Sequence, residues 1–367
     1  MAFSLSLLRK WKWRTVNSAL PPWPRPQTFR SDAALEAIAK ASQHNLSTIF
    51  LYNYPSFSGA FSALFAHLFH SRINLPCLIL PFSSVEPLRV EDLCTEGLEN
   101  LYLLDFFGPK GFAEELSRRA SFKVIGFDHR KSVLPIIPSE EDCPANLKFH
   151  LNVEKSSSIA VYEYFSAKLS QTKHSDGMVA SLLESKDQGR VEMILKHIED
   201  TDLRRWSLPD TKAFNIGLDK WRSKLNCLTN PYMYEQLMEI NSADLIAVGN
   251  SYISTREKAA EKLLNKAFKV MLGRGFYGEC LGVRADTNSD LVDEIGKKLS
   301  VKSAAAGLRP IGAVIHMQGS NLKVCLRSTV NGIDTSEVAK AYGGGGSSSS
   351  SSFIIRMDEY NQWLSAI

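Results

Sequence analysis

Residues 48–64 decide the fold of this chain and read TIFLYNYPSFSGAFSAL. They combine an apolar run of strand-forming residues (48–52), a turn that ends at Pro55, and a helical pattern that continues to residue 70. Further short apolar runs stand at 75–80, 101–104 and 122–126. Polar, helix-like intervals separate these runs at 93–100 and 111–119. Strands that alternate with helices predict an α/β fold, with a doubly wound parallel sheet covered by helices on both faces.

Polar side chains follow the predicted strands at the point where each strand ends. Asn53–Gly59 follow the first strand, Asp105 follows the third, and Asp128-His129-Arg130 follow the fourth. Ligands of a parallel sheet bind at the carboxyl ends of its strands, so two carboxylates and an imidazole are expected at one edge. Each residue taken alone is better explained as a turn former or a helix cap. Because all three are expected at one edge, a ligand site is as good an explanation as separate turns and caps.

The rest of the chain predicts a helical connector and a second α/β unit. Helices are expected at 32–44, 156–169, 188–199, 254–273 and 290–299. A short unassigned segment stands around 277–283. Strands are expected at 311–318, 322–327 and 353–357, the first two as a hairpin about Gly319-Ser320-Asn321. The predicted domains are residues 45–206, a connector at 207–245, and residues 246–367.

The first 31 residues differ from the average composition. They hold six cations and no acid before Asp32, interleaved with leucine and tryptophan: Arg9, Lys10, Lys12, Arg14, Arg25 and Arg30. An acid-free, basic and amphipathic leader is typical of an organellar transit peptide. We expect a mitochondrial location for the mature protein, with the chloroplast as second choice and a plain basic tail as the remaining alternative.

Composition excludes several classes of protein. The 367 residues carry 43 Lys plus Arg against 39 Asp plus Glu, and the net charge of +4 is too small to argue for a nucleic-acid or membrane partner. No apolar stretch reaches the 18 or more residues of a membrane span. The six cysteines are scattered and form no CxxC pair, so they predict neither a zinc site nor a disulfide framework.

Four segments, in order and with matching spacing, resemble the motifs of the DHH phosphoesterase family. Ser58–Leu64 resembles its first motif, Asp-Gly-Ala-Phe-Ala-Ala-Leu, and Leu103–Phe106 resembles the second. Gly126–Arg130 stands where the Asp-His-His triplet of that family stands, and Glu199–Trp206 resembles the fourth motif. The resemblance covers the chain from about Thr48 to the C-terminus.

The C-terminal part resembles the associated DHHA1 domain, which implies a smaller, mixed-sheet lobe. Lys323–Ser328 and a glycine run carry this resemblance, and they include the candidate phosphate-binding residues Arg327, Gly343, Gly344, Gly345 and Gly346. Taken alone, the Gly-Ser run 343–352 would be interpreted as a flexible linker, whereas its place in the motif order indicates a remodelled substrate loop.

The resemblance implies a two-lobed hydrolase of phosphodiesters, short oligonucleotides, cyclic dinucleotides or phosphoanhydrides. Members of the family use a pair of divalent ions, commonly manganese, between the lobes. This sequence departs from the pattern at several positions. The first-motif aspartates fall on Ser56 and Ser58, and the first-motif histidine on Tyr52 or, with a slip, on Asn53. The second triplet histidine is Arg130, and the histidine after the glycine run is Ser347.

The remaining family positions are Asp105, Asp128, His129 and Asp202. As metal ligands we expect Asp105, His129 and Asp202, if any, with Asp128 orienting a histidine. Two divalent ions carry four positive charges that carboxylates must neutralise, and this set supplies two or three. The sequence therefore predicts either no metal or a single, weakly bound manganese or magnesium ion.

The leading hypothesis is a pseudo-phosphoesterase that binds nucleotide or nucleic acid. Arg130 and Lys131 would contact phosphate beside His129, and the glycine amides of 343–346 would approach it closely. An equal alternative for Arg130 is an ion pair with Asp128 or Asp202. Two other functions stay open: a phosphoesterase that works with one metal, and a structural subunit that binds protein partners in an organellar complex.

Overall fold

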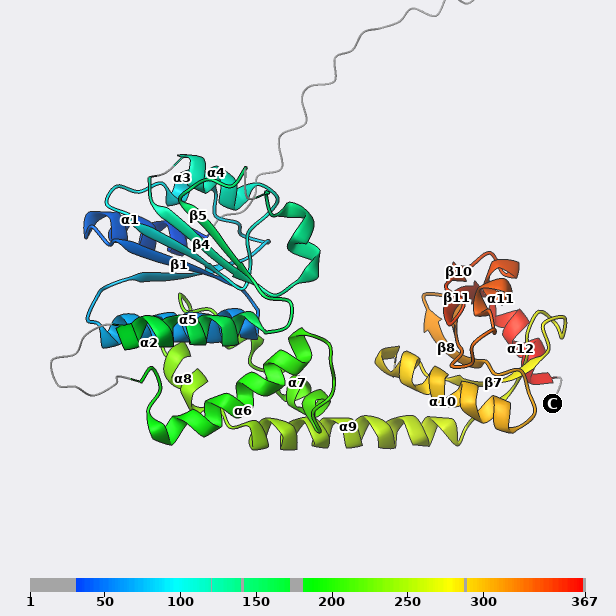
Figure 1. Cartoon of the computed structure of the whole chain (residues 1–367). Helices are drawn as coiled ribbons and strands as arrows, with labels where there is room; N and C mark the ends of the chain where they lie inside the picture. The colour runs from blue at the N-terminus through cyan, green and yellow to red at the C-terminus, as the bar shows by residue number, and fades with distance from the viewer. Residues whose placement is uncertain (1–30, 120, 140–141, 172–180, 287–288, 366–367) are drawn as a thin grey trace, which may run out of the picture. The chain divides into compact units, whose positions relative to one another are not determined.

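The computed structural model describes residues 31–119, 121–139, 142–171, 181–286 and 289–365 (Figure 1). The predicted leader at 1–31 therefore lies, except for Ser31, outside the described residues. The chain forms two compact units: one holds residues up to 205 together with 221–240, and the other holds 206–220 and 241 onward. Within the described residues, no helix has the length and apolar character that crossing a membrane requires.

The first unit is built on a five-stranded parallel sheet of order β2-β1-β3-β4-β5. Its strands are β1 (Thr48–Asn53), β2 (Leu78–Phe82), β3 (Asn100–Leu104), β4 (Lys123–Asp128) and β5 (Leu147–Leu151). The sequence predicted the first four, with β2 placed three residues early. It missed β5, because Lys148 and His150 interrupt the apolar residues of this strand and leave no continuous apolar run.

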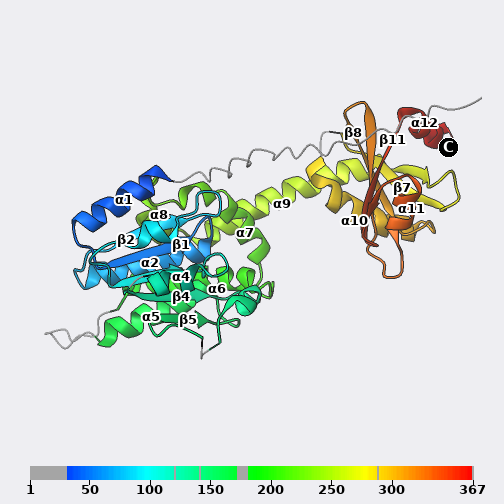
Figure 2. The same cartoon turned by 90° about the horizontal axis from the view of Figure 1, so that it is seen from above.

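Helices cover both faces of this sheet, as predicted (Figure 1, and from above in Figure 2). On one face lie α1 (Asp32–Gln43), α3 (Val90–Leu93) and α4 (Phe112–Arg119), and on the other α2 (Phe57–Arg72) and α5 (Ser157–Gln171). Successive side chains of β1 point to opposite faces of the sheet, so their contacts show which helices cover each face. Ile49 and Leu51 join the core that contains Ile38 of α1, whereas Phe50 packs edge-on against Phe165 of α5. The doubly wound architecture is thus confirmed.

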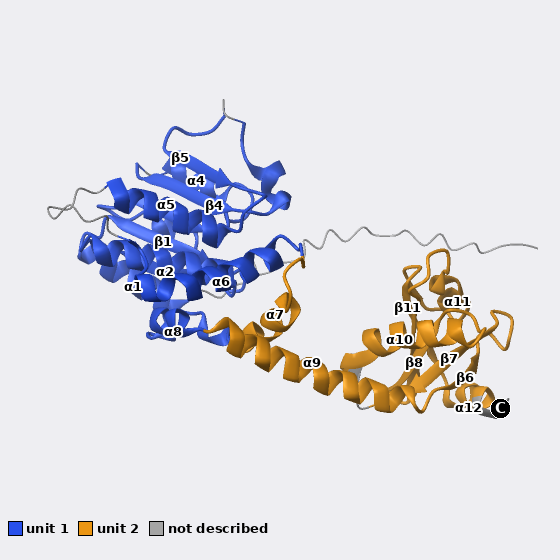
Figure 3. Ribbon diagram, turned by 60° about the horizontal axis from the view of Figure 1, so that its bottom comes forward, with its two compact units in different colours: residues 1–205, 221–240 blue, residues 206–220, 241–367 orange. Residues whose placement is uncertain are grey.

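The predicted connector at 207–245 is divided between the two units (Figure 3). Helix α7 (Thr211–Asp219) packs on α9 (Ser242–Leu264) in the second unit, and the contact is so close that a Cβ at Gly249 would meet the Ala213 carbonyl. The segment with η2 (Arg222–Lys224) and α8 (Met233–Glu239) belongs to the first unit. Helix α6 (Ser185–Asp202) and the short η1 (Lys131–Ile136) complete that unit.

The second unit contains a six-stranded mixed sheet of order β10-β11-β9-β8-β7-β6. Its strands are β6 (Phe268–Met271), β7 (Glu279–Arg284), β8 (Gly312–Gln318), β9 (Asn321–Arg327), β10 (Gly345–Gly346) and β11 (Ser350–Ile355). Its other elements are η3 (Ser289–Leu291), α10 (Val292–Ala305), α11 (Thr335–Ala341) and α12 (Met357–Ser365). The predicted hairpin is present as β8–β9.

One predicted helix of the second unit was misplaced. The helix expected at 254–273 lies earlier, as α9, and β6 follows it, because Val270 and Leu272 alternate into the core with the period of a strand. The Gly-Ser run is not the flexible linker that its composition alone would indicate: Gly345 and Gly346 pair antiparallel with Ser352 and Ser351. The serines alternate too, since Ser351 is buried and donates its hydroxyl to the Thr335 carbonyl.

Candidate functional site

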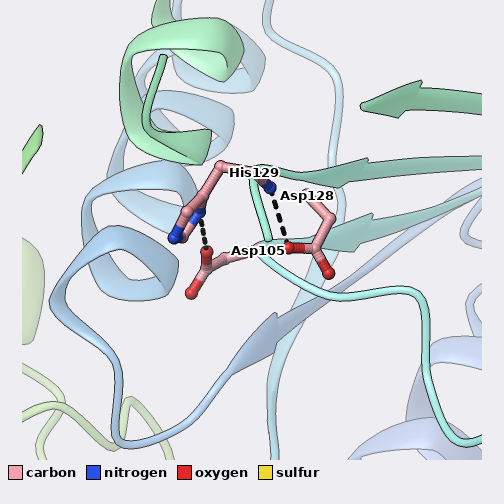
Figure 4. Close-up of side chains that lie close together, drawn as sticks. All are labelled: Asp105, Asp128 and His129. Carbon is pink, nitrogen blue, oxygen red and sulfur yellow. Dashed lines mark hydrogen bonds and ion pairs between the residues drawn. The ribbon is translucent and has the colours of Figure 1, made fainter. Parts of the chain in front are cut away.

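The candidate site lies at the carboxyl edge of the parallel sheet. Asn53 is the last residue of β1, Asp105 directly follows β3, and Asp128 is the last residue of β4. The chain moves outward from β1 to β2 and then returns to β3 on the other side, so a crevice opens between β1 and β3. Asp105, Asp128 and His129 each offer a ligand atom within 4.8 Å of the others (Figure 4).

Asp105 is the centre of this cluster and is 1% exposed. Its Oδ2 accepts hydrogen bonds from Asn53 Nδ2 at 3.0 Å and from Ser56 Oγ at 2.6 Å. Its Oδ1 lies 3.2 Å from His129 Nδ1 (Figure 4). The backbone of Asp105 has a φ of 67°, a left-handed conformation that places the side chain under the ends of β1 and β4.

The pKa values of this pair move in opposite directions. Burial favours the neutral form of Asp105, but the hydrogen bond and charge of His129, together with Ser56 and Arg130, outweigh it and lower the pKa. Burial also opposes protonation of His129, yet the hydrogen bond that its ring donates to Asp105 and the charges of the nearby carboxylates raise its pKa. Both shifts stabilise a carboxylate–imidazolium pair inside the protein.

Arg130 is paired with Asp128. Its Nε lies 2.8 Å from Asp128 Oδ1 and its Nη2 lies 2.7 Å from Oδ2. Oδ1 also accepts the backbone N–H groups of His129 and Arg130, at 2.7 and 3.0 Å, and Arg130 Nη2 donates to the Asp105 carbonyl at 2.8 Å. Of the two roles open for Arg130, the structure contains the ion pair, while the side chain stays 40% exposed.

The two serines at the first-motif aspartate positions have structural partners. Ser56 Oγ caps α2 by accepting the Gly59 N–H at 3.2 Å, besides donating to Asp105. Ser58 Oγ accepts the Ser158 N–H at the start of α5, at 3.0 Å. Its neighbour Ser157 places Oγ 2.9 Å from His129 Nδ1. Hydroxyls therefore hold two helix N-termini against the cluster without adding charge.

Asp202, at the end of α6, contributes a carboxyl group that is mostly neutral in acid solution. Its Oδ2 is buried and has no hydrogen-bond partner among the described residues. Burial and the charge of Asp105 raise the pKa of Asp202 to about 7, against the opposing effects of His129, Ser58 and Arg130. The cluster thus keeps fewer negative charges than its count of carboxyl groups suggests.

A pocket of about 600 Å³ adjoins the cluster on the first unit. Its charged and titratable lining residues are four basic residues, one histidine and two acidic residues: Arg130, Lys131, Arg204, Arg205, His129, Glu154 and Asp202. Arg205 donates to the Glu154 carbonyl at 2.8 Å. The exposed side chains of Lys131 and Arg204 have neither an ion-pair nor a hydrogen-bond partner within the described part of the chain.

The residues at this edge do not fit a pair of divalent ions. Ser56, Ser58 and Asn53 offer neutral oxygens or an amide where carboxylates would be needed. Both oxygens of Asp128 already bind the Arg130 guanidinium. What remains is Asp105, His129 and Asp202, the ligand set predicted from the sequence, and in it Asp202 is protonated up to about pH 7.

The predicted phosphate-binding residues at 327 and 343–346 belong to the second unit. Arg327, on β9, donates its Nε to Asp293 Oδ1 at 2.9 Å and is 16% exposed. Gly343 and Gly344 lead from α11 into β10, and Gly345 and Gly346 form β10 itself. Ser347 is exposed in the hairpin loop, where its N–H donates to the Ser350 carbonyl.

The structure also separates alternatives that the sequence left open. Asn53, and not Tyr52, reaches Asp105, because the Tyr52 hydroxyl donates to the Leu225 carbonyl on the opposite side of β1. The contact of Ser157 with His129 was missed, since the sequence placed Ser157 only within the helix expected at 156–169. The signal for this contact in the sequence was the position of Ser157, a polar residue at the start of the helix that follows the last strand of the sheet.

No family model and no curated protein matches this sequence. Solved structures that are similar include a pGpG-specific phosphodiesterase from Vibrio cholerae, with 10% identity over 87% of this chain and 97% of the other, at a TM-score of 0.38. The exonuclease RecJ bound to manganese has 12% identity over 91% and 92%, at 0.34. An exopolyphosphatase-related protein from Bacteroides fragilis has 13% identity over 91% and 95%, at 0.29.

These similarities are too low to transfer a residue role, so the chemistry of the cluster rests on this chain alone. Each of the three alignments spans 87% or more of both chains.

Proposed function

We propose that the first unit binds the phosphate of a nucleotide or of a nucleic-acid strand, without a divalent ion and without hydrolysing it. The observation that carries this proposal is the pocket beside the cluster, where Lys131 and Arg204 are exposed and have no side-chain partner among the described residues. Cations that are free to pair with a ligand are what a phosphate site needs.

Charge compensation inside the cluster supports the same proposal. Arg130 neutralises Asp128, and His129 faces Asp105, so neither carboxylate is left to repel an anion. Asp202 holds its proton up to about pH 7, because burial raises its pKa. A phosphate in the pocket therefore meets a positive surface at neutral pH.

The same compensation argues against hydrolysis. Two-metal phosphoesterases need an ion-bound water as nucleophile and carboxylates that hold both ions. Here the serine hydroxyls and the Arg130–Asp128 pair take those positions. We propose that the protein needs no metal cofactor for binding.

Binding and turnover are tested together on the purified protein. A fluorescent dinucleotide, a short RNA and a cyclic dinucleotide are titrated in EDTA and again in manganese. The double variant Lys131→Ala/Arg204→Ala is expected to weaken binding at least tenfold, since each lost charge-assisted contact contributes roughly 1 kcal/mol. The control is Lys40→Ala on α1, which removes an exposed cation that does not line the pocket.

A specific observation favours a second candidate, a phosphoesterase that uses one metal. Asp105, Asp128 and His129 have ligand atoms close enough to share an ion. Turnover in manganese that Asp105→Asn abolishes would establish this candidate and disprove the proposal. A stoichiometric protein partner whose binding is insensitive to changes at His129 or Arg130 would instead favour the structural subunit.

We propose a mitochondrial location, on the composition of residues 1–31 alone. Fusing this segment to a fluorescent protein tests it, with a matched fusion in which the six cations are replaced by glutamine. Import of the first fusion only is the expected result, and a diffuse signal from both would contradict it.

A further inference from the structure

We propose that the guanidinium of Arg130 is a resident cation that takes the place of a divalent ion at Asp128, and that it keeps a latent metal site closed. The inference concerns the cluster without ligand, so it does not depend on the phosphate proposal. Asp128 is fully buried and Arg130 reaches it from the pocket side, with 40% of the side chain exposed.

The contact geometry is that of a fixed ligand. Nε and Nη2 approach the two oxygens of Asp128 at 2.8 and 2.7 Å, which is the two-point fork of arginine on a carboxylate. Nη2 also donates to the Asp105 carbonyl at 2.8 Å. Arg130 thus bridges the residues that end β3 and β4, as an ion between the two strand ends would do.

A ligand set for an ion is present beneath the guanidinium. The ligand atoms of Asp105, Asp128 and His129 lie within 4.8 Å of one another. Asp105 Oδ1 is buried and lies 3.2 Å from His129 Nδ1, and no other described residue donates a hydrogen bond to it. Two carboxylates and an imidazole suit manganese or a similar divalent ion.

What closes this site is the occupation of Asp128. While Arg130 binds both oxygens of Asp128, a divalent ion could bind this carboxylate only by displacing the guanidinium. The ion would also place its two positive charges beside the positive charge of Arg130. Removing the guanidinium leaves a buried carboxylate without its counter-charge, which a divalent ion can then supply.

The test compares Arg130→Ala with Lys131→Ala. Both variants lose one positive charge from the same pocket, but Lys131 makes no contact with Asp128. Thermal unfolding is measured in EDTA and in 1 mM manganese chloride, and manganese binding is measured from the electron paramagnetic resonance signal of the free ion.

Wild type and Lys131→Ala are expected to unfold at the same temperature with and without manganese. Arg130→Ala is expected to lose about 5 °C or more in EDTA, to recover at least half of that in manganese, and to bind the ion at least tenfold more tightly than wild type. Equal manganese affinity in wild type and Arg130→Ala would overturn the proposal, and so would an Arg130→Ala protein as stable as wild type without manganese.

A second variant covers the case in which Arg130→Ala does not fold in EDTA. Asp128→Asn/Arg130→Ala removes both charges, so it is expected to fold and to show no response to manganese. If the double variant folds while Arg130→Ala cannot be recovered even with manganese in the buffer, an ion does not replace the guanidinium and the proposal is wrong.

Discussion

The sheet edge of the first unit and the Gly-Ser hairpin of the second depart from the family pattern in opposite ways. At the sheet edge, Asp128 pairs with the Arg130 guanidinium, and Asp105 lies against the His129 imidazole, whose pKa is raised by the nearby carboxylates. The hairpin at 343–352 has no charged side chain at all, and its hydrogen bonds are made by backbone and hydroxyl groups. The charges of the sheet edge are therefore balanced within the protein, whereas the hairpin has no charge to balance.

The two regions have different weaknesses. A buried, compensated charge is sensitive to the loss of a partner, because the remaining group stays desolvated. A hairpin made of glycine and serine is sensitive to added volume, because its backbones lie close together. Substitutions in each region should therefore fail for different physical reasons.

The largest effect is expected for Asp105→Ala. The change leaves His129, Asn53 and Ser56 facing a void inside the first unit, and we expect a loss of about 3 kcal/mol in the free energy of unfolding. Urea unfolding followed by circular dichroism measures it. A loss below about 1 kcal/mol would show that the cluster is not the electrostatic centre of the unit.

The second unit has its own sensitive position at Gly344. A Cβ there would lie 2.2 Å from the Ser352 carbonyl oxygen, so Gly344→Ala is expected to destabilise the unit by about 2 kcal/mol. Gly345→Ala is the matched control, because nothing lies within 4 Å of its Cβ position. Equal melting temperatures for the two variants would contradict the steric explanation.

A smaller, pH-dependent effect is expected for Asp202→Asn. The folded protein holds this proton up to about pH 7, whereas the unfolded carboxyl group releases it near its ordinary pKa of 3.8. The wild type therefore loses stability as the pH rises from about 4 to 7, and the amide removes that loss. The stability of the Asn variant relative to the wild type should therefore be greater at pH 8 than at pH 4. Melting curves at both values test the sign.

The smallest effect is expected for Asp293→Ala, which breaks the pair with Arg327. The Asp293 side chain is 60% exposed, so solvent screens the pair and the change should stay within about 0.5 kcal/mol. This variant is the surface counterpart of Asp105→Ala, measured by the same urea titration. A loss as large as that of Asp105→Ala would remove the contrast between the regions.

Strand order and chain position were enough to predict the meeting of Asp105, Asp128 and His129, because each follows a parallel strand. The orientation of Arg130 was not predictable, since pairing with Asp128 and exposure to a ligand use the same side chain. The choice between Tyr52 and Asn53 was hidden for a different reason. Neighbouring residues of a strand face opposite sides of the sheet, so only one of Tyr52 and Asn53 can face Asp105. The hydrogen bond of Tyr52 with Leu225, which is distant in sequence, shows that Tyr52 faces the other side.

Composition misled most in the Gly-Ser run. A stretch of glycine and serine has the statistics of a linker, yet Ser351 and Phe353 alternate into the core as strand residues do. Residues Ser350–Ile355 form a strand because they pair with β9. Pairing with a strand elsewhere in the chain cannot be predicted from the local residue types.

The left-handed backbone conformation at Asp105 limits the residue types that this position can accept. At a φ of 67°, branched and bulky residues are strained, and aspartate, asparagine and glycine are the types that tolerate the conformation. The shape of the main chain is therefore by itself a reason for an acidic residue at this corner. The presence of Asp105 alone is for that reason a poor indicator of catalysis.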